Sequence, residues 1–239
     1  MNFRKKIILS AAAVIIAGSG IQARNLTLTT SDGKKISASL SIPADLKGKV
    51  PAVILIHQGG SDRSEWKWLI PRLTGKQYIV LAYDIRGHGK SDSVSSRRSL
   101  YNDPRQAPKD LLAAVKYLKK LKTVDSRRIA IIGSSIGGNL AMAASSRGLI
   151  KTVAAISCKT SAVKNLSGKQ KVSFQSAMII SSARDQNGKR ARWARELYNM
   201  TISPKNLVIV KESASHGVSI FKDDPSLTDK VLQWLKQTL

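Results

Sequence analysis

The sequence has 239 residues, of which 42% are hydrophobic, so it has the length of one globular domain and enough apolar side chains for a sizeable core. This composition excludes an intrinsically disordered chain, and the single cysteine, Cys158, excludes an internal disulfide bond. The formal charge of +25 predicts attraction to anionic surfaces.

The first 23 residues form a segment of their own. The basic residues Arg4–Lys6 precede a short apolar run, residues 7–17, which small residues follow. This order is typical of a secretory signal peptide, and the run is too short to cross a bilayer comfortably as a permanent helix. We expect cleavage after Ala23 and export to the periplasm or the exterior of a bacterium, leaving residues 24–239 as a mature domain without a membrane span. The alternative is an uncleaved membrane anchor.

Removal of this segment takes away three basic residues and lowers the formal charge from +25 to +22. The remaining lysines and arginines are scattered, and no basic run with interleaved aromatic residues indicates a nucleic-acid-binding module. We therefore expect no specific nucleic-acid partner. Electrostatic association with anionic surfaces of the cell envelope stays open, beside the simpler reading of a solvated basic surface.

Short strand patterns alternate with longer helical patterns from residue 25 onward. Residues 26–30 and 36–42 alternate apolar and polar side chains around the turn sequence Ser31–Gly33, which predicts a hairpin with one exposed face. The later runs are almost continuously apolar, as expected of strands buried on both faces of a parallel sheet. They cover residues 52–56, 78–83, 129–132, 152–156, 177–180 and 207–210.

Helical patterns lie between these strands. We expect helices over residues 66–73, from Asp103-Pro104 onward, over residues 136–146 and 189–199, and from Asp224-Pro225 onward. A hairpin followed by alternating strands and helices predicts an α/β protein. Its architecture is a three-layer α/β/α sandwich around a mostly parallel sheet with an N-terminal antiparallel hairpin.

The pentapeptide Gly133–Gly137 has the pattern Gly-x-Ser-x-Gly, with Ser135 at its centre. It lies between an apolar strand and an apolar helix, where a sharp turn projects the serine hydroxyl above the sheet. The helix that begins at Ile136 directs its positive end towards developing negative charge. Ser134 does not fit the pattern, because only Ser135 has a glycine two places away on each side. The sequence predicts Ser135 as a nucleophile.

A serine nucleophile needs a base, and the chain has three histidines, His57, His88 and His216. In proteins with this serine turn, the order along the chain is serine, then acid, then histidine. Only His216 follows Ser135, so the sequence predicts His216 as the base.

Three carboxylates lie between Ser135 and His216. Glu196 is inside a predicted helix, and Glu212 is too close to His216 along the chain. Asp185 follows the strand at 177–180 through a short loop, at the strand end where open α/β sheets assemble their sites. Asp185 is therefore the predicted partner of the histidine.

Attack on a carbonyl also needs hydrogen-bond donors for the oxyanion. The first would be the backbone N–H of Ile136, and the second should come from the loop His57–Ser61. We expect the side chain of His57 to brace this loop rather than to act as a base.

These features resemble the α/β-hydrolase superfamily, particularly its compact dienelactone-hydrolase-like and small-esterase branches, from about Leu26 to Leu239. The resemblance implies that Ser135, Asp185 and His216 form a catalytic triad. It is carried by the apolar strand that ends at His57, the Asp84–Ser91 segment, the serine turn, Asp185 and His216-Gly217.

The resemblance also implies Gly59 and Ile136 as oxyanion donors. Relatives usually have glycine directly after the His57 position, whereas this chain has Gln58, which leaves the N–H of Gln58 as the alternative to that of Gly59. The Asp84–Ser91 segment looks like a structural loop of the family, so we do not expect its histidine to be catalytic.

Many relatives insert a helical cap where this chain has residues 157–175, a short and polar stretch. We therefore expect no large cap, and small or soluble esters, thioesters or surface-displayed acyl groups as substrates rather than large lipids. The leading interpretation is an exported serine hydrolase of the carboxylesterase type that works through an acyl-enzyme. A serine peptidase or amidase with the same triad and a non-catalytic exported binding protein are the alternatives. No sequence motif indicates a metal or cofactor.

Overall fold

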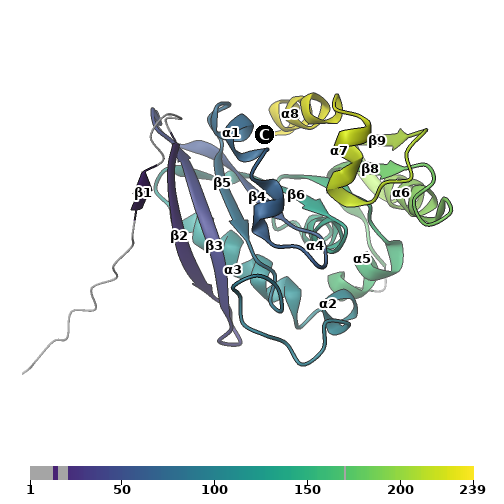
Figure 1. The fold of residues 1–239 in the computed structure, drawn as a ribbon, viewed down its shortest axis with the longest axis horizontal. Helices are drawn as coiled ribbons and strands as arrows, with labels where there is room; N and C mark the ends of the chain where they lie inside the picture. Colours follow the sequence, from purple (N-terminus) through teal and green to yellow (C-terminus); the bar gives the residue numbers. More distant parts are fainter. Residues whose placement is uncertain (1–12, 16–20, 170) are drawn as a thin grey trace, which may run out of the picture.

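The structure is a computed structural model and describes residues 13–15, 21–169 and 171–239 (Figure 1). Most of the predicted signal peptide, residues 1–23, lies outside the described residues; residues 13–15 form a short strand, and residues 21–23 open the next one. The processing of this segment therefore stays a prediction.

The described strands form one nine-stranded sheet in the order β1-β2-β3-β5-β4-β6-β7-β8-β9. Neighbours from β1 to β5 are antiparallel, and neighbours from β5 to β9 are parallel. This confirms the predicted mostly parallel sheet with an N-terminal hairpin. The strands are β1 Ala13–Ile15, β2 Ile21–Thr29, β3 Lys35–Pro43, β4 Val50–Ile56, β5 Ile79–Tyr83, β6 Val124–Ser134, β7 Thr152–Ile156, β8 Phe174–Ser182 and β9 Thr201–Val210.

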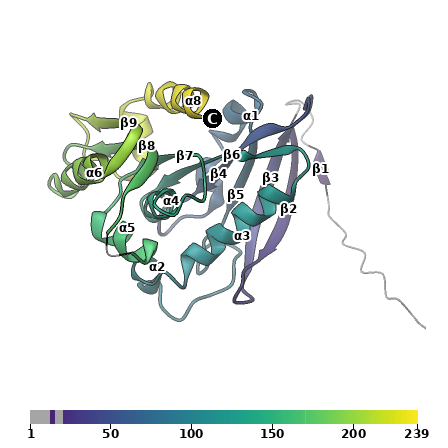
Figure 2. The ribbon, with the colours of Figure 1, turned by 180° about the vertical axis from the view of Figure 1, so that it is seen from behind.

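Helices cover both faces of this sheet, which confirms the three-layer architecture (Figures 1 and 2). The α-helices are α1 Ile70–Thr74, α2 Ser99–Asn102, α3 Ala107–Lys120, α4 Ile136–Ser145, α5 Thr160–Ser167, α6 Lys189–Asn199, α7 Ile220–Asp223 and α8 Leu227–Thr238. There are also two 3₁₀ turns in the described residues. The turn η1 Arg63–Trp66 follows β4, and the turn η2 Gly217–Ser219 follows β9.

Two hydrophobic cores lie on opposite faces of the sheet. On one face, apolar side chains of α3, α4, α5 and α6 pack against alternate residues of the strands, such as Ile54 and Ile131. On the other face, residues of η1, α1, α7 and α8 pack against the intervening strand residues, such as Leu55 and Ile132. The alternation follows from the two-residue period of a strand, and it explains why β4 and β7 are buried throughout.

Three helical predictions need correction. The helix expected over 66–73 is divided into η1 and α1, and Pro71 lies in the first turn of α1, where its missing N–H costs no helical hydrogen bond. The helix expected from Asp103 onward begins at Ala107, after a turn in which Asp103 caps the N–H of Arg105. The helix expected from Asp224 onward begins at Leu227.

The polar stretch 157–175 also differs from the prediction, because it contains the helix α5. Val163 and Leu166 of this helix are fully buried and belong to the core on the α4 face. The sequence pattern did not predict this helix, because the four lysines of the stretch make it polar on average although one side of the helix is apolar. A helix of eight residues is no separate cap domain, so the prediction that no large cap is present is confirmed.

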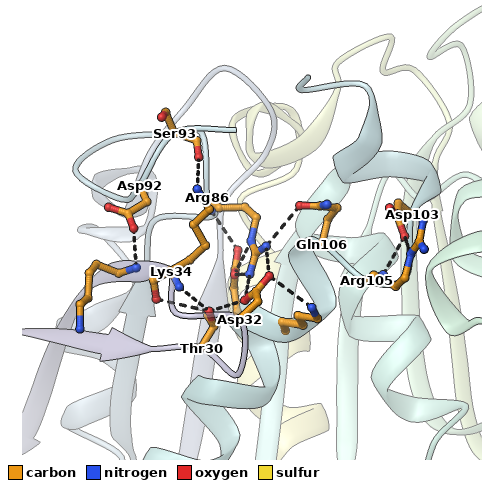
Figure 3. Close-up of polar contacts among 12 residues, drawn as sticks. Thr30, Asp32, Lys34, Arg86, Asp92, Ser93, Asp103, Arg105 and Gln106 are labelled. Atoms are coloured by element: carbon orange, nitrogen blue, oxygen red, sulfur yellow. Dashed lines mark hydrogen bonds and ion pairs between the residues drawn. The ribbon is translucent and has the colours of Figure 1, made fainter. Parts of the chain in front are cut away.

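The hairpin turn between β2 and β3 is held by a buried arginine from another part of the chain (Figure 3). Arg86, which is 1% exposed, donates to both oxygens of Asp32 in the turn at 2.9 and 3.1 Å. Its Nε and backbone N–H bind the buried carboxylate of Asp110 on α3 at 2.7 and 2.9 Å. The Asp84–Ser91 segment therefore connects the hairpin to the parallel sheet, which agrees with the structural role expected for it.

Candidate active site

Ser135 lies in a tight turn between the end of β6 and the start of α4. Its backbone has φ 52° and ψ −109°, a strained conformation for a residue with a side chain. The N–H of Ser135 donates to the carbonyl of Ile156, the last residue of β7, at 2.8 Å. The neighbouring strand thus holds the turn in place, and such strain is typical of functional positions.

The glycines of the pentapeptide are required by close backbone approach. A Cβ at Gly133 would overlap the carbonyl of Gly137, and a Cβ at Gly137 would overlap the carbonyl of Ile56 on β4. At Gly138, the next residue of the helix, it would lie 2.8 Å from the carbonyl of Ile156. The first turn of α4 therefore packs directly onto the ends of β4 and β7, as the sequence pattern predicts.

His216 and Asp185 lie beside Ser135. The Nε2 atom of His216 is 2.9 Å from Ser135 Oγ, and its Nδ1 atom is 2.6 Å from Asp185 Oδ2. The carboxylate side chain is 5% exposed, whereas the histidine side chain is 34% exposed. The structure thus brings the three residues chosen from the sequence into one hydrogen-bonded chain, with the serine end open to solvent.

The loop that carries His216 is fixed by short polar contacts. The N–H of Gly217 donates to Ser157 Oγ at 3.0 Å, and the hydroxyl of Ser182 donates to the carbonyl of Ser215 at 2.7 Å. Gly217 has φ 63°, and a Cβ there would overlap the side chain of Gln58. These contacts hold the imidazole against the end of the sheet without occupying its ring nitrogens.

The two N–H groups proposed for the second oxyanion position differ in their surroundings. The N–H of Gln58 points to the carboxylate of Glu65, with distances of 3.3 and 3.4 Å to its two oxygens. Burial raises the pKa of Glu65 above its ordinary value. Gly59 lies against the hydroxyl of Tyr101, which comes from α2. Ile136 is the first residue of α4, where a backbone N–H has no acceptor within the helix.

Sequence reasoning missed Glu65 and Tyr101. Neither lies in a recognisable motif, and each reaches the loop through the tertiary packing of η1 or α2. The Gln58 side chain, which the sequence left without a definite position, accepts a hydrogen bond from Ser134 Oγ at 3.2 Å and packs against Gly217. It therefore connects the loop after β4 to the histidine loop.

His57 is buried and structural. The N–H of Ile85 donates to its Nε2 at 2.9 Å, so Nδ1 carries the proton and donates to the carbonyl of Gln58 at 2.7 Å. Burial lowers the pKa of His57 to about 4, which keeps the ring neutral. His88 is also buried, and its ring packs edge-on against that of His57 with 5.1 Å between centroids. Neither ring reaches Ser135 by a hydrogen bond among the described residues.

A groove with a volume of about 1060 Å³ begins at the loop after β4 and runs between α1 and α8. Gln58, Ser61 and Glu65 line its inner end, and Trp68 and Phe221 form an aromatic wall with 5.1 Å between ring centroids. A second cavity of about 670 Å³ lies between the hairpin and η1 and contains none of the residues predicted for the site. The groove beside Gln58 therefore offers the larger space next to the oxyanion loop.

Within residues 13–15, 21–169 and 171–239, histidine, cysteine and carboxylate side chains nowhere gather in threes with the geometry of a metal site. The helices of this part of the chain are also too short or too polar to cross a membrane.

Parts of this sequence are similar to known proteins. A family model described as "Serine aminopeptidase, S33" matches residues 48–162. An uncharacterized protein of Mycobacterium tuberculosis (Rv2307c) is 32% identical over 133 residues, which are 56% of this chain and 43% of that protein. Uncharacterized protein YfhR of Salmonella typhi is 27% identical over 126 residues, which are 52% of this chain and 40% of the relative. The matches thus span about two fifths of the length of these relatives.

Solved structures share the whole fold. An acetyl xylan esterase from Paenibacillus sp. R4 superposes with a TM-score of 0.78 at 15% identity, over 96% of this chain and 88% of that one. The Pyrococcus furiosus esterase Pf2001 superposes with a TM-score of 0.71 at 23% identity, over 90% and 92% of the two chains. The chain has the α/β-hydrolase fold, and its residues 48–162, which include the serine turn, match the family model.

Proposed function

We propose that the protein is a serine hydrolase that cleaves carboxylic esters or thioesters of small or soluble substrates through an acyl-enzyme. The observation that carries the proposal is the hydrogen-bonded chain from Asp185 through His216 to Ser135, with distances of 2.6 and 2.9 Å. The same arrangement of acid, imidazole and serine performs acyl transfer on several unrelated folds.

The first half of the reaction follows from the protonation of His216. With Nδ1–H donated to Asp185, Nε2 is free to accept the proton of Ser135 as Oγ attacks the substrate carbonyl. The nearly buried carboxylate then stabilises the imidazolium, which returns the proton to the leaving alcohol or thiol. A bond forms from Ser135 Oγ to the acyl carbon, and the bond to the leaving group breaks.

The second half uses the same groups on water. His216 Nε2 accepts a proton from a water molecule, whose oxygen attacks the acyl carbon, and the proton then returns to Ser135 Oγ as the acyl group leaves as a carboxylic acid. In both halves the carbonyl oxygen carries negative charge. We assign its donors as the N–H groups of Ile136 and Gly59, because the N–H of Gln58 already has Glu65 as an acceptor.

The names of solved proteins that share the fold support ester cleavage over peptide cleavage. Two of the structures that share the fold over about nine tenths of the chain are named as esterases, and one of these is an acetyl xylan esterase. The matching family model, in contrast, is described as an aminopeptidase, which supports a peptidase as the second candidate. Parallel assays with an ester, 4-nitrophenyl acetate, and with amides, aminoacyl 4-nitroanilides, separate the esterase from the peptidase. Both kinds of substrate release a coloured nitroaromatic product, so the two rates can be compared by absorbance.

The nucleophile is tested with a Ser135→Ala variant. We expect it to lose covalent labelling by a fluorophosphonate probe and to lower kcat for 4-nitrophenyl acetate by about 10⁴-fold or more. Ser146→Ala, at the far end of α4, is the matched control and should keep both properties. Full activity in the Ser135 variant would overturn the assignment. A folded wild-type protein that takes no label would instead support a non-catalytic binding protein.

We further propose that the protein is exported, on the basis of the basic head, apolar run and small residues before Arg24. Expression of the full chain in a bacterium, followed by N-terminal sequencing of the periplasmic and membrane fractions, tests this proposal. A soluble periplasmic form that begins at Arg24 is expected. Retention of the intact chain in the membrane fraction would favour the uncleaved anchor.

A further inference from the structure

Arg190, the second residue of α6, is a buried cation without a full set of partners. Its side chain is 9% exposed, and its Nη1 atom donates to the carbonyl of Ser157 at 2.7 Å. Its Nε atom is buried and has no hydrogen-bond partner among the described residues, and the ion pairs found there do not include Arg190. A buried charge is costly unless an opposite charge accompanies it. The guanidinium therefore has unused capacity for an anion.

A second cation shares the surroundings of Arg190. The guanidinium carbon of Arg190 lies 5.3 Å from the ring centroid of Trp193, and the Nζ atom of Lys159 lies 5.7 Å from the same centroid. An indole face attracts a cation but supplies no hydrogen-bond acceptor and no full negative charge. Lys159, like its neighbour, takes part in none of the ion pairs of the described segments. We call Lys159, Arg190 and Trp193 the Arg190 cluster.

The Arg190 cluster is connected to the catalytic residues through the backbone. Ser157, whose carbonyl binds Arg190, directly follows Ile156, whose carbonyl accepts the N–H of Ser135. The N–H of Arg190 also lies 3.4 Å from the carbonyl oxygen of Asp185. Arg190 thus contacts Ser157, the residue after the one that holds the serine turn, and it also contacts the backbone of Asp185.

Three titratable side chains lie near Arg190. Burial lowers the pKa of Arg190, while the nearby Asp185 carboxylate, Cys158 thiol and Tyr101 hydroxyl act to raise it. The Asp185 carboxylate pairs with His216, and among the described residues the Arg190 guanidinium forms no hydrogen bond or ion pair with it or with the Cys158 thiol. Tyr101 packs against Gly59 of the oxyanion loop. Tyr101 therefore lies near both Arg190 and the loop after β4.

We propose that Arg190, assisted by Lys159, binds a carboxylate of the substrate, so that the preferred esters are anionic. The inference rests on the proposed ester hydrolysis and names its substrate class. A guanidinium binds a carboxylate through parallel N–H donors and with opposite charge. A carboxylate is therefore a better ligand for Arg190 than a neutral or a cationic group. The carboxylate can belong to the acyl part or to the alcohol part of the ester, and these two sources need separate assays.

Two pairs of substrates distinguish the sources. For the acyl part, 4-nitrophenyl hydrogen adipate is compared with neutral 4-nitrophenyl hexanoate. For the alcohol part, 4-acetoxybenzoate is compared with its neutral methyl ester. In each pair, the measured quantity is the ratio of kcat/KM for the anionic ester to kcat/KM for the neutral ester, in wild type and in Arg190→Met.

We expect this ratio to fall about tenfold or more in Arg190→Met for one of the pairs, since a charge-assisted hydrogen bond is lost from the anionic ester alone. Lys159→Gln, at an exposed position, should lower it by about two- to fivefold, and Arg190→Lys should give an intermediate value. Arg195→Gln, exposed on the same helix and outside the Arg190 cluster, is the control and should leave the ratio unchanged.

An equal loss for anionic and neutral esters would show that Arg190 only holds the carbonyl of Ser157, and would overturn the proposal. An unchanged ratio in both pairs would also overturn it. If Arg190→Met does not fold, the ratios of Lys159→Gln and Arg190→Lys decide in the same way.

The failure of the proposed function has a different signature. If wild type hydrolyses neither member of either pair, calorimetric titration of Ser135→Ala with adipate and with 4-hydroxybenzoate still tests the carboxylate site without catalysis. Binding that is lost in the Ser135→Ala, Arg190→Met double variant supports the site. Absence of binding to the single variant overturns it.

Discussion

Gly137 is a position in the serine turn that has no room for a side chain. A Cβ there would overlap the carbonyl of Ile56, where the first turn of α4 packs onto the end of β4. We expect Gly137→Ala to lower the free energy of unfolding by about 1–3 kcal/mol and to abolish most of the ester hydrolysis, because the turn must shift to make room. Urea unfolding and the 4-nitrophenyl acetate assay measure the two effects.

Gly75→Ala is the matched control for this variant. Gly75 has φ −62°, and the nearest atom to a Cβ there is 3.2 Å away, so a small adjustment suffices. We expect a change below about 1 kcal/mol and unchanged activity. If Gly137→Ala kept the stability and activity of the wild type, close packing would not be the reason for the glycine.

His57 makes stability dependent on pH, because its pKa falls from 6.5 to about 4 on folding. As the pH drops below 6.5, the unfolded chain binds a proton that the folded chain does not, so stability is lost between pH 6.5 and 4. We expect the loss from this group to reach about 3 kcal/mol at pH 4. Urea midpoints measured across this range provide the check.

His57→Gln separates this effect from that of the carboxylates. The variant should be less stable than wild type at pH 7, since two hydrogen bonds change, but its stability should fall less between pH 6.5 and 4. Parallel pH profiles for the two proteins would contradict the assignment of this proton to His57.

The candidate site shows which residues a sequence can and cannot identify. Ser135, Asp185 and His216 were predicted from their order and from the strands that precede them, and the structure places them within hydrogen-bond distance of each other. Glu65 and Tyr101 were not predicted, because their contacts with the loop after β4 depend on how η1 and α2 pack. Motifs report local geometry, whereas these neighbours are set by tertiary structure.

The hairpin β2–β3 depends on a buried ion-pair network at its turn (Figure 3). Arg86 holds the pKa of Asp32 well below its usual range and also binds Asp110, which is 0% exposed. We expect Arg86→Met to lower the free energy of unfolding by about 3–5 kcal/mol, since it leaves a buried carboxylate without its partner. Chemical denaturation followed by circular dichroism measures the change.

Arg105→Met provides the control within the same region. Arg105 pairs with Asp103, but its side chain is 82% exposed, so the pair is screened by water. We expect no measurable change in the free energy of unfolding. Similar losses in the two variants would mean that burial does not decide the value of these ion pairs.

The elements were predicted with unequal success for a physical reason. Strands buried on both faces, such as β4 and β7, consist of continuous apolar runs, and their positions were predicted within a few residues. Helix starts were less accurate: α3 begins at Ala107 because Asp103 caps a preceding turn instead of the helix. Helix α5 was missed because lysines flank its few apolar residues, and its apolar face is recognisable only from its packing on α4.

The described residues form one sheet with a core on each face, and the residues of the candidate site come from loops at one end of the parallel strands. Different helices form the two cores, and both cores pack on the same sheet. The sheet therefore sets the positions of Ser135, Asp185 and His216 relative to each other. The N-terminal hairpin lies at the opposite edge of the sheet from β8 and β9, which lead to Asp185 and His216 (Figures 1 and 2). Changes at that edge should therefore affect stability before they affect activity.

The proposed processing after Ala23 provides a test at this scale. It would remove β1 and the first three residues of β2, but the pairs from Arg24–Leu40 to Thr29–Lys35 would remain. We expect the chain that begins at Arg24 to unfold within about 1 kcal/mol of a chain that begins at Ile21, because only edge pairs are lost. A chain that begins at Thr30 should be much less stable, since it exposes the β3 edge and loses the buried Leu28 side chain, which alone contributes roughly 1.5–3 kcal/mol. Urea unfolding of the three chains measures these differences, and a large loss in the chain that begins at Arg24 would show that cleavage at this position is incompatible with the fold.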